Sequence, residues 1–195
     1  ASSSSSSSST RAQGEEAGSA PSGVTNRSTG GVETGFDSAG IPTGAFLKEL
    51  HERQHQLALR LEPGSVAILP AAGAMHVPGT QIPLPYRQEA SFRYLTGIEA
   101  SDIIAAIEAS PTGQKATYRL FVPEKNVERE VWEGKTISAR EGCDIYGADE
   151  TQTLSYFPAY LARVVKQNRP VVINSKMWRG HRFSKLFTGS GGAVS

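Results

Sequence analysis

His51, Glu52 and His55 lie in the sequence H-E-R-Q-H, which fits the H-E-x-x-H pattern of zinc peptidases. On a helix, residues four positions apart share one face, so the two histidines could bind one metal ion. Glu52 would then act as the general base on a zinc-bound water. These three side chains raise the hypothesis of a zinc hydrolase.

A catalytic zinc ion needs a third protein ligand, and the sequence offers none at the expected spacing. The extended form of the motif has glycine at position 58 and histidine at position 61, where this chain has Ala58 and Leu61. Arg53 lies between the two histidines, where a further positive charge beside a dication is unfavourable. We therefore favour a charged helix over a metal site and keep the zinc peptidase as the weakest alternative.

Residues 44–62 have the apolar periodicity of an amphipathic helix, with Thr43 as N-cap and Pro63-Gly64 as the stop. The predicted apolar stripe of this helix consists of Phe46, Leu50, Leu57 and Leu61, flanked by Leu47 and Ala58. A stripe at this spacing predicts that the helix packs against a core.

Apolar runs further along the chain predict strands at 65–71, 102–109, 117–123 and 170–175. Residues 76–88 are rich in proline and glycine and predict an irregular loop. Helices are predicted at 138–146 and 153–168, and Pro158 predicts that the second starts late or kinks. The buried face of that second helix is predicted to hold Leu154, Phe157, Leu161 and Val165. This order of elements predicts an α/β fold with a mixed sheet flanked by helices.

The charge balance excludes two classes of partner. The chain has 20 Lys and Arg and 19 Asp and Glu, so its net charge is near zero. A protein that binds nucleic acid or a membrane surface usually has an excess of positive charge, which this chain lacks. No apolar stretch is long enough to span a bilayer. The lone cysteine, Cys143, excludes an internal disulfide and a multi-cysteine zinc site.

Composition divides the chain near residue 40. Residues 1–40 are rich in Ser, Gly and Thr, and a segment with so few large apolar side chains is expected to be disordered. It is either a solvated leader or linker, or the remnant of a targeting peptide; its serines and arginines suit the second origin, and its acidic residues count against it. We predict a folded domain over 41–187 and a flexible tail over 188–195.

The stretch PLPYRQEASFRYLTGI, residues 83–98, resembles the N-terminal domain of aminopeptidase P and its creatinase and prolidase relatives. The family pattern Y-P-[FY]-R-Q-x-[SA]-x-F-x-Y-L-T-G-F is matched in order by Tyr86, Arg87, Gln88, Phe92, Tyr94, Leu95, Thr96 and Gly97. The family's L-F-V-P run is matched at 120–123, and its R-E-x-W-x-G-[RK] run at 129–135. The resemblance covers about residues 46–175, and several ordered matches outweigh one five-residue motif.

The resemblance assigns expected roles to two sets of residues. Tyr86, Arg87 and Trp132 would lie at the rim of a substrate pocket or at an interface. The residues expected to maintain the fold are Gln88, Phe92, Tyr94, Gly97 and Gly134. We expect the two glycines to adopt positive φ or allow close backbone approach at strand ends. Arg87, placed beside a buried strand, would need a carboxylate or carbonyl partner.

In this family the chemistry belongs to a second, C-terminal domain, where two Asp, one His and two Glu hold two metal ions, usually manganese. None of those ligands can be placed on this chain, so we predict no catalytic or metal-binding residues here. The resemblance implies a non-catalytic domain of a Xaa-Pro aminopeptidase that supports oligomerisation and the rim of the pocket. Its partners would be further copies of itself or its own missing catalytic domain, with a peptide as substrate.

The alternative is a stand-alone binding or regulatory module of the same fold, and whether the chain is an enzyme is left open. The leader and the likeness to organellar family members favour a mitochondrion or another organelle, and otherwise the cytoplasm.

Overall fold

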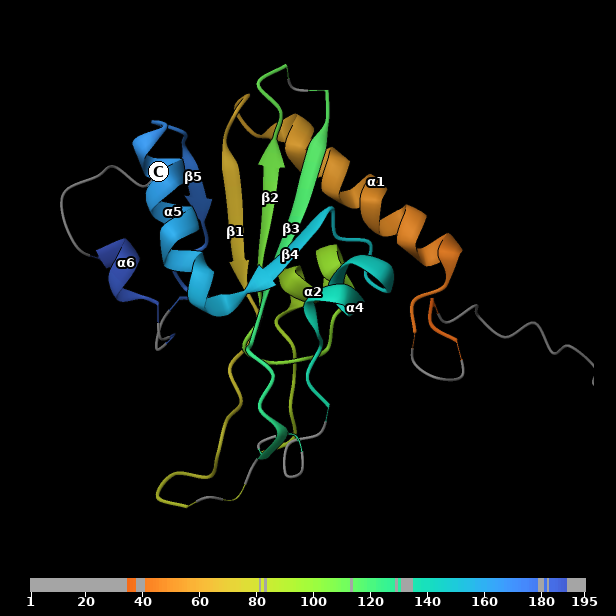
Figure 1. The fold of residues 1–195 in the computed structure, drawn as a ribbon, viewed down its shortest axis with the longest axis vertical. Coiled ribbons are helices and arrows are strands. Elements are labelled where there is room, and N and C mark those ends of the chain that lie inside the picture. Colours follow the sequence, from red (N-terminus) through yellow and green to blue (C-terminus); the bar gives the residue numbers. More distant parts are fainter. Residues whose placement is uncertain are drawn as a thin grey trace, which may run out of the picture. The chain divides into compact units, whose positions relative to one another are not determined.

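The computed structural model describes residues 35–37, 41–80, 82, 84–112, 114–128, 130, 135–178, 181 and 183–188. Its helices are α1 (Gly44–Arg60), α2 (Ala90–Thr96), α4 (Ala139–Asp144), α5 (Phe157–Lys166) and α6 (Lys185–Thr188), with a 3₁₀ turn η1 (Leu154–Tyr156) (Figure 1). Its strands are β1 (Val66–Pro70), β2 (Ile104–Ala109), β3 (Ala116–Val122), β4 (Glu150–Thr153) and β5 (Val171–Ile173). Trp132, Gly134, the predicted tail apart from residue 188, and most of the predicted leader lie outside the described residues.

The five strands form one mixed sheet in the order β4-β3-β2-β1-β5. The three central strands are antiparallel neighbours, and each edge strand runs parallel to the strand beside it. Helices flank the sheet, so the predicted α/β class with a mixed sheet is confirmed. Strands β2 and β3 pair antiparallel, from Ile104 with Phe121 to Ala109 with Ala116.

The sequence did not predict strand β4. Its four residues, E-T-Q-T, have no apolar run and are half-buried or exposed, so neither signal used to predict strands is present. The strand exists because it pairs with β3, Arg119 opposite Glu150 and Val122 opposite Thr153. The predicted helix after it begins later than residue 153: η1 comes first and α5 starts at Phe157, with Pro158 in its first turn, where a missing N–H is tolerated.

Helix α1 is capped as predicted, because the Thr43 side chain accepts a hydrogen bond from the Phe46 N–H. Its buried face is centred on Leu50, Gln54 and Ala58, while Phe46 and the other stripe leucines are half-buried. Gln54 is buried because its amide donates to the Leu95 carbonyl at 2.8 Å. A polar side chain thus joins α1 to α2 at the centre of the apolar stripe.

Helix α2 places the family motif in the fold. Glu89 caps its first turn, Phe92 is fully buried, and Gly97 closes it in the left-handed conformation with φ of 68°. The positive φ expected for Gly97 is confirmed, but the expected strand end is wrong: the glycine ends a helix. A Cβ at Gly97 would lie only 3.0 Å from the Phe46 ring and 3.1 Å from Leu50 Cδ1, so α1 packs directly against this turn.

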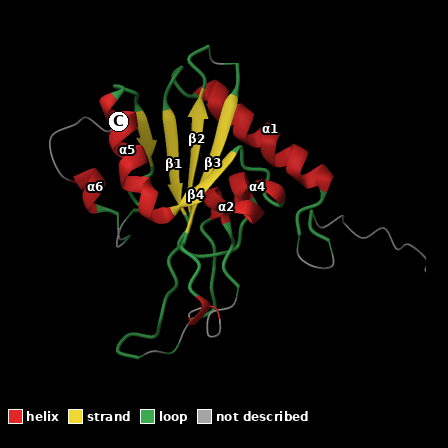
Figure 2. Ribbon diagram, viewed as in Figure 1, coloured by secondary structure: helices red, strands yellow, loops and turns green. Residues whose placement is uncertain are grey.

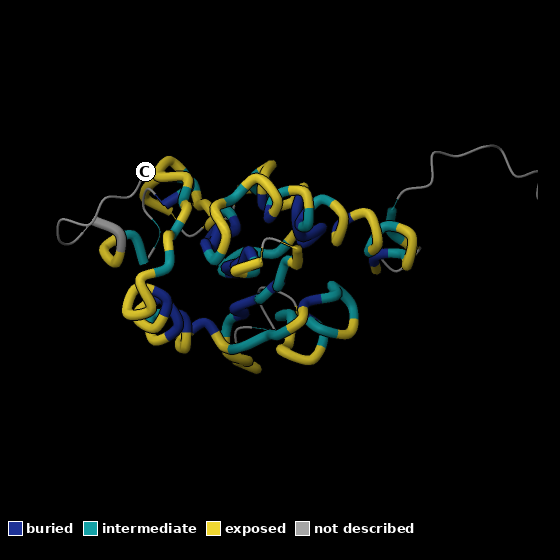
Figure 3. Tube along the Cα trace, turned by 90° about the horizontal axis from the view of Figure 1, so that it is seen from above, coloured by how far each residue is buried: buried dark blue, intermediate teal, exposed yellow. Residues whose placement is uncertain are grey.

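Apolar side chains cover both faces of the sheet. On one face α5, Trp178 and Phe183 pack over β1, β2 and β3, and on the other α2 and the α4–β4 turn pack over the same strands. Figure 3 views these elements from above, with buried residues concentrated toward the middle. Val165, predicted to face the core, is 61% exposed. Val164 is buried instead, because it lies three and four positions after the buried Leu161 and Tyr160 and so shares their face of the helix.

The described contacts of the domain begin before the predicted boundary at residue 41. The Gly35 carbonyl accepts from the Thr43 N–H, Phe36 bridges to Pro42, and the Phe36 ring lies 5.0 Å from that of Phe46. Residues 35–37 therefore pack on the start of α1. No helix in the described part of the chain is long and apolar enough to cross a bilayer.

Candidate functional site at the loop edge of the sheet

Strands β1, β3, β4 and β5 point the same way, so their carboxyl ends meet at one edge of the sheet. Strand β2 runs in the opposite direction and begins at that edge. We call this edge the loop edge, because the described parts of the connections 71–89, 97–103 and 123–138 lie there (Figure 2). Binding residues are commonly found on loops at such strand ends, because the sheet holds the loops in place.

Gln88 ties two of these connections together. Its side-chain oxygen accepts from the Ala72 N–H at 2.8 Å, and its amide nitrogen donates to the carbonyls of Ile98 and Ala100 at 3.1 and 3.0 Å. Ala72 follows β1 and Ala100 precedes β2, so one side chain bridges the exit of one strand to the entry of the next. Gln88 thus positions the segment that carries Tyr86 and Arg87.

Tyr86 bridges the same two segments from outside. Its hydroxyl lies 3.2 Å from the Ala72 carbonyl and 3.1 Å from the Ala100 carbonyl, and its one proton can be donated to either. Burial of the hydroxyl, with a smaller contribution from the Asp102 carboxylate, raises the pKa of Tyr86 to about 12. The phenol therefore stays protonated at physiological pH and acts as a donor. The residue as a whole remains 38% exposed.

Replacing Gln88 by alanine is expected to lower the free energy of unfolding by about 2 kcal/mol, because it leaves the half-buried Ala72 N–H and the Ile98 carbonyl without their partner. Urea unfolding followed by circular dichroism measures the loss. Gln56→Ala is the matched control: among the described residues the exposed Gln56 side chain donates only to Glu52 on its own helix, and its loss is expected to stay within about 0.5 kcal/mol. Equal effects of the two variants would contradict the bridging role of Gln88.

Arg87 and Tyr94 both face solvent. The guanidinium of Arg87 makes no hydrogen bond or ion pair within the described residues, so the expected carboxylate or carbonyl partner is not found among them. The side chain is exposed, and water can hydrate its charge. Tyr94 is 57% exposed on α2, where the Arg53 guanidinium lies 4.3 Å from its ring centroid and donates to its carbonyl. Arg53 therefore stacks on Tyr94 and helps to join α1 to α2.

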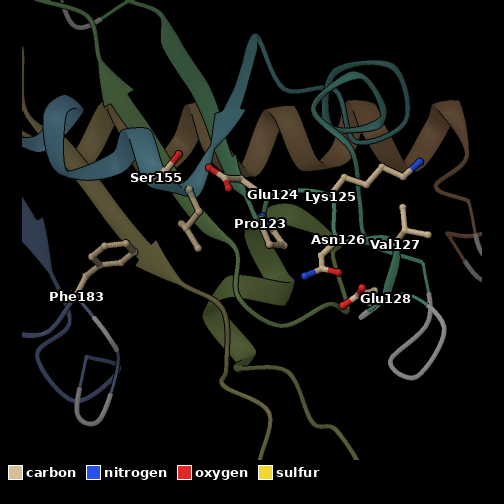
Figure 4. Close-up of a pocket in the computed structure, with 9 residues that line it drawn as sticks. Pro123, Glu124, Lys125, Asn126, Val127, Glu128, Ser155 and Phe183 are labelled. Atoms are coloured by element: carbon tan, nitrogen blue, oxygen red, sulfur yellow. The ribbon is translucent and has the colours of Figure 1, made fainter.

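Two hollows flank the loop that follows β3, and they share Pro123 and Lys125. The first has a volume of about 850 Å³; Figure 4 shows Phe183 on one side of it, Asn126, Val127 and Glu128 on the other, and Pro123 between them. The second, of about 520 Å³, lies against α4 and the 135–138 segment. Trp132 and Gly134 lie outside the described residues. Their expected roles therefore remain predictions.

The zinc hypothesis finds little support in the surroundings of the motif. His51 Nε2 lies 3.0 Å from the Gly147 carbonyl; since a carbonyl only accepts, this nitrogen carries the proton and has no free lone pair for a metal. Glu52 is exposed and accepts from Gln56. In the part of the chain that the structure describes, no three His, Cys, Asp or Glu side chains are grouped to hold a metal ion. His51 instead joins α1 to the α4–β4 turn, where Gly147 adopts a φ of 67°.

A buried ionic network at the opposite edge was not predicted. The Glu108 carboxylate of β2 accepts from Arg119 Nε and from an Arg169 Nη, both at 2.6 Å, and from the Tyr160 hydroxyl at 2.9 Å. Arg119 also pairs with Glu150 of β4. The sequence contains one signal for this network: Glu108 lies within an apolar run predicted to be a strand, and a buried charge requires partners. Gln54 left the same kind of signal, as a polar residue within the stripe of α1.

The sequence and the fold described above are similar to those of known proteins. A protein-family model described as the N-terminal domain of aminopeptidase P matches residues 50–173, from within α1 to the end of β5. The chain belongs to this family. The match includes the Tyr86–Gly97 motif, the loop edge and all five strands, so the resemblance found in the sequence is confirmed.

Three relatives place the domain within longer proteins. Intermediate cleaving peptidase 55 of Saccharomyces cerevisiae is 26% identical over 132 residues, which are 67% of this chain and 26% of the relative. Human Xaa-Pro aminopeptidase 3 is 29% identical over 92 residues, 46% of this chain and 18% of the relative. The Arabidopsis thaliana protein named intermediate cleaving peptidase 55, mitochondrial, is 23% identical over 134 residues, 69% of this chain and 26% of the relative.

The crystal structure of the yeast protein, Icp55, has the same fold. It superposes with a TM-score of 0.58 at 23% identity, covering 66% of this chain and 30% of that one. The chain therefore spans only 18–26% of the length of these relatives and 30% of the crystallised yeast chain.

Proposed function

We propose that this chain is the non-catalytic N-terminal domain of a manganese-dependent Xaa-Pro aminopeptidase, whose catalytic domain lies in sequence outside these 195 residues. The family match over 50–173, which amounts to only a quarter of the yeast relative, carries this proposal. Relatives named as Xaa-Pro aminopeptidases support the substrate class, a peptide with proline in its second position.

The described residues do not fit a manganese centre of the kind the family uses. Such a centre needs a cluster of carboxylates and imidazoles, and no such group is present among them. No catalytic step is therefore assigned to this chain. We propose that this domain supplies a contact surface. The sheet fixes the position of the loop edge, and the loop edge would face the catalytic domain.

Tyr86, Arg87 and Trp132 are proposed to form the rim of the substrate pocket or an interface. Support comes from the exposed positions of the first two at the loop edge, on a segment that Gln88 holds in place. An exposed guanidinium is suited to a carboxylate or carbonyl of a peptide or of a second domain.

A mitochondrial location is proposed from two observations. One is the printed name of the Arabidopsis relative. The other is the Ser-rich leader with arginines at positions 11 and 27.

A peptidase assay tests the non-catalytic role. The 195-residue chain is incubated with Mn²⁺ and a peptide with proline in second position, beside human Xaa-Pro aminopeptidase 3 as positive control. The chain is expected to release no N-terminal residue above the metal-only blank, because the described residues contain no ligand cluster that could hold a metal ion and activate water. Metal-dependent turnover that disappears in His51→Ala would overturn the proposal in favour of the zinc peptidase.

A further inference from the structure

The near-zero net charge of the whole chain conceals an uneven distribution of charge along it. Residues 151–195 contain seven of the 20 Lys and Arg residues and none of the 19 Asp and Glu residues. The first 150 residues therefore hold 13 basic and 19 acidic residues, a net charge of −6. A field of one sign over one part of a protein favours a partner of the opposite sign.

Four of these seven cations are exposed, and none of the four forms an ion pair with a carboxylate among the described residues. They are Arg163 and Lys166 on α5, Lys176 in the turn after β5, and Lys185 on α6. Of the others, Arg169 is paired with Glu108, and Arg179 and Arg182 lie outside the described residues. The four exposed charges are therefore available to a ligand, and we call the surface that they form the basic face.

Aromatic contacts hold together the segments that carry these cations. The Phe157 ring, at the start of α5, lies 6.2 Å from the Trp178 ring and 5.4 Å from the Phe183 ring. Lys176 comes two residues before Trp178, and Lys185 comes two residues after Phe183. Figure 1 shows α6 next to α5. The basic face is thus fixed to the core of the domain rather than carried on a free tail.

The basic face adjoins the larger hollow of the loop edge. Leu154, Ser155 and Phe183 line this hollow, and Figure 4 shows Ser155 and Phe183 on the same side of it. A ligand chain that leaves the hollow on this side would pass over the start of α5 and the segment before α6. Val165 and Leu186 are exposed beside the cations and would contact apolar atoms of such a chain.

We propose that the basic face binds an acidic stretch of the polypeptide substrate, downstream of the N-terminal residue that is removed. Carboxylates pair with exposed guanidinium and ammonium groups, and an extended peptide presents every second side chain to one surface. The continuity of this face with the hollow favours a polypeptide over other anions, because the proposed function places a peptide at the loop edge. The inference rests on the proposed function and deepens it by naming a substrate class.

Fluorescence anisotropy with the 195-residue chain at pH 7.5 and about 50 mM NaCl tests the proposal, because low salt screens exposed charges little. The probe is a labelled peptide of about twelve residues with proline in second position and about six glutamates further on. The wild-type chain is expected to bind it at micromolar Kd, and to bind the same peptide with glutamine for glutamate at least about tenfold more weakly.

Charge reversal locates the binding surface. Arg163→Glu/Lys166→Glu and Lys176→Glu/Lys185→Glu are each expected to raise the Kd at least about tenfold, since two attractions become two repulsions. Lys48→Glu/Arg60→Glu is the matched control, because it changes the net charge equally at exposed positions of α1. Its Kd should stay within about threefold of wild type, and unchanged melting temperatures show that all variants fold.

Three results would overturn the assignment. One is a wild-type chain that does not distinguish the glutamate peptide from the glutamine peptide. Another is a control variant that weakens binding as much as the other two, which would assign the effect to net charge alone. The third is tighter binding of single-stranded DNA or of phosphatidylserine vesicles, which would assign the face to a nucleic acid or a membrane. Binding is measured without catalysis, whereas the peptidase assay and the native reading frame test the proposed function, so each can fail without the other.

Discussion

Replacing Glu108 by alanine is expected to lower the free energy of unfolding by about 3 kcal/mol at pH 7. The substitution removes a carboxylate that accepts from Arg119, Arg169 and Tyr160. The two guanidinium side chains are each only 22% exposed, so their charges would remain in the protein with fewer partners. Breaking a buried pair from one side costs about 3–5 kcal/mol, and the partial exposure places this loss at the lower end.

The same network makes stability depend on pH in a known direction. Burial by itself raises the pKa of Glu108, but the hydrogen bonds from Arg169 and Tyr160, with the charge of Arg169, outweigh it and hold that pKa below its ordinary value of 4.5. The contribution is therefore complete above pH 4.5 and is lost as the pH falls through the lowered pKa of the folded state.

Urea unfolding of wild type, Glu108→Ala and Glu108→Gln at pH 7 and again at pH 3 measures both effects. The gap between wild type and Glu108→Gln should narrow at the lower pH, because glutamine does not titrate. Glu99→Ala is the control: Glu99 pairs with Arg93 on the surface, both side chains being more than half exposed, and its loss should cost under about 1 kcal/mol. A Glu108→Ala loss as small as that of Glu99→Ala would show that the network contributes little.

Gly97→Val is expected to destabilise the domain by about 3 kcal/mol. A valine at φ of 68° meets the left-handed penalty of about 1–2 kcal/mol, and its side chain would also press on Phe46 and Leu50. The substitution strikes the contact between α1 and the end of α2, where Gln54 also bonds to Leu95. Thermal and urea unfolding both measure the effect.

Gly64→Val separates the two causes. Gly64 has a φ of 80°, but a Cβ there would have no atom within 4 Å, so its substitution carries the backbone penalty alone. The difference between the two variants then gives the steric contribution of Phe46 and Leu50, expected to be about 1–2 kcal/mol. Equal losses at the two glycines would mean that α1 moves aside freely and that the Gly97 contact is not specific.

Local patterns predicted most of the fold. The strands β1, β2, β3 and β5 have apolar runs, and α1 has both its stripe and its Thr43 cap, so each could be located from neighbouring residues alone. Strand β4 has no such pattern, because its pairing with β3 depends on residues distant in sequence. The order of strands in the sheet was likewise not predictable, since pairing is set by tertiary packing.

The candidate site was less predictable than the fold. The motif resemblance drew attention to Tyr86, Arg87 and Gln88. It did not predict the hydrogen bonds from Gln88 to Ala72 and Ala100, because these partners are backbone groups, which are the same for every residue type. H-E-x-x-H has a chemical meaning only with a third ligand nearby in space, and five residues cannot supply that information.

The most direct test of the central claim is the sequence of the native transcript beyond the codon for Ser195. The proposed function predicts that the reading frame continues into a second domain with two Asp, one His and two Glu at metal-ligand spacing. A stop codon directly after Ser195, together with a native protein of 20.8 kDa, would contradict the claim and leave a stand-alone binding module.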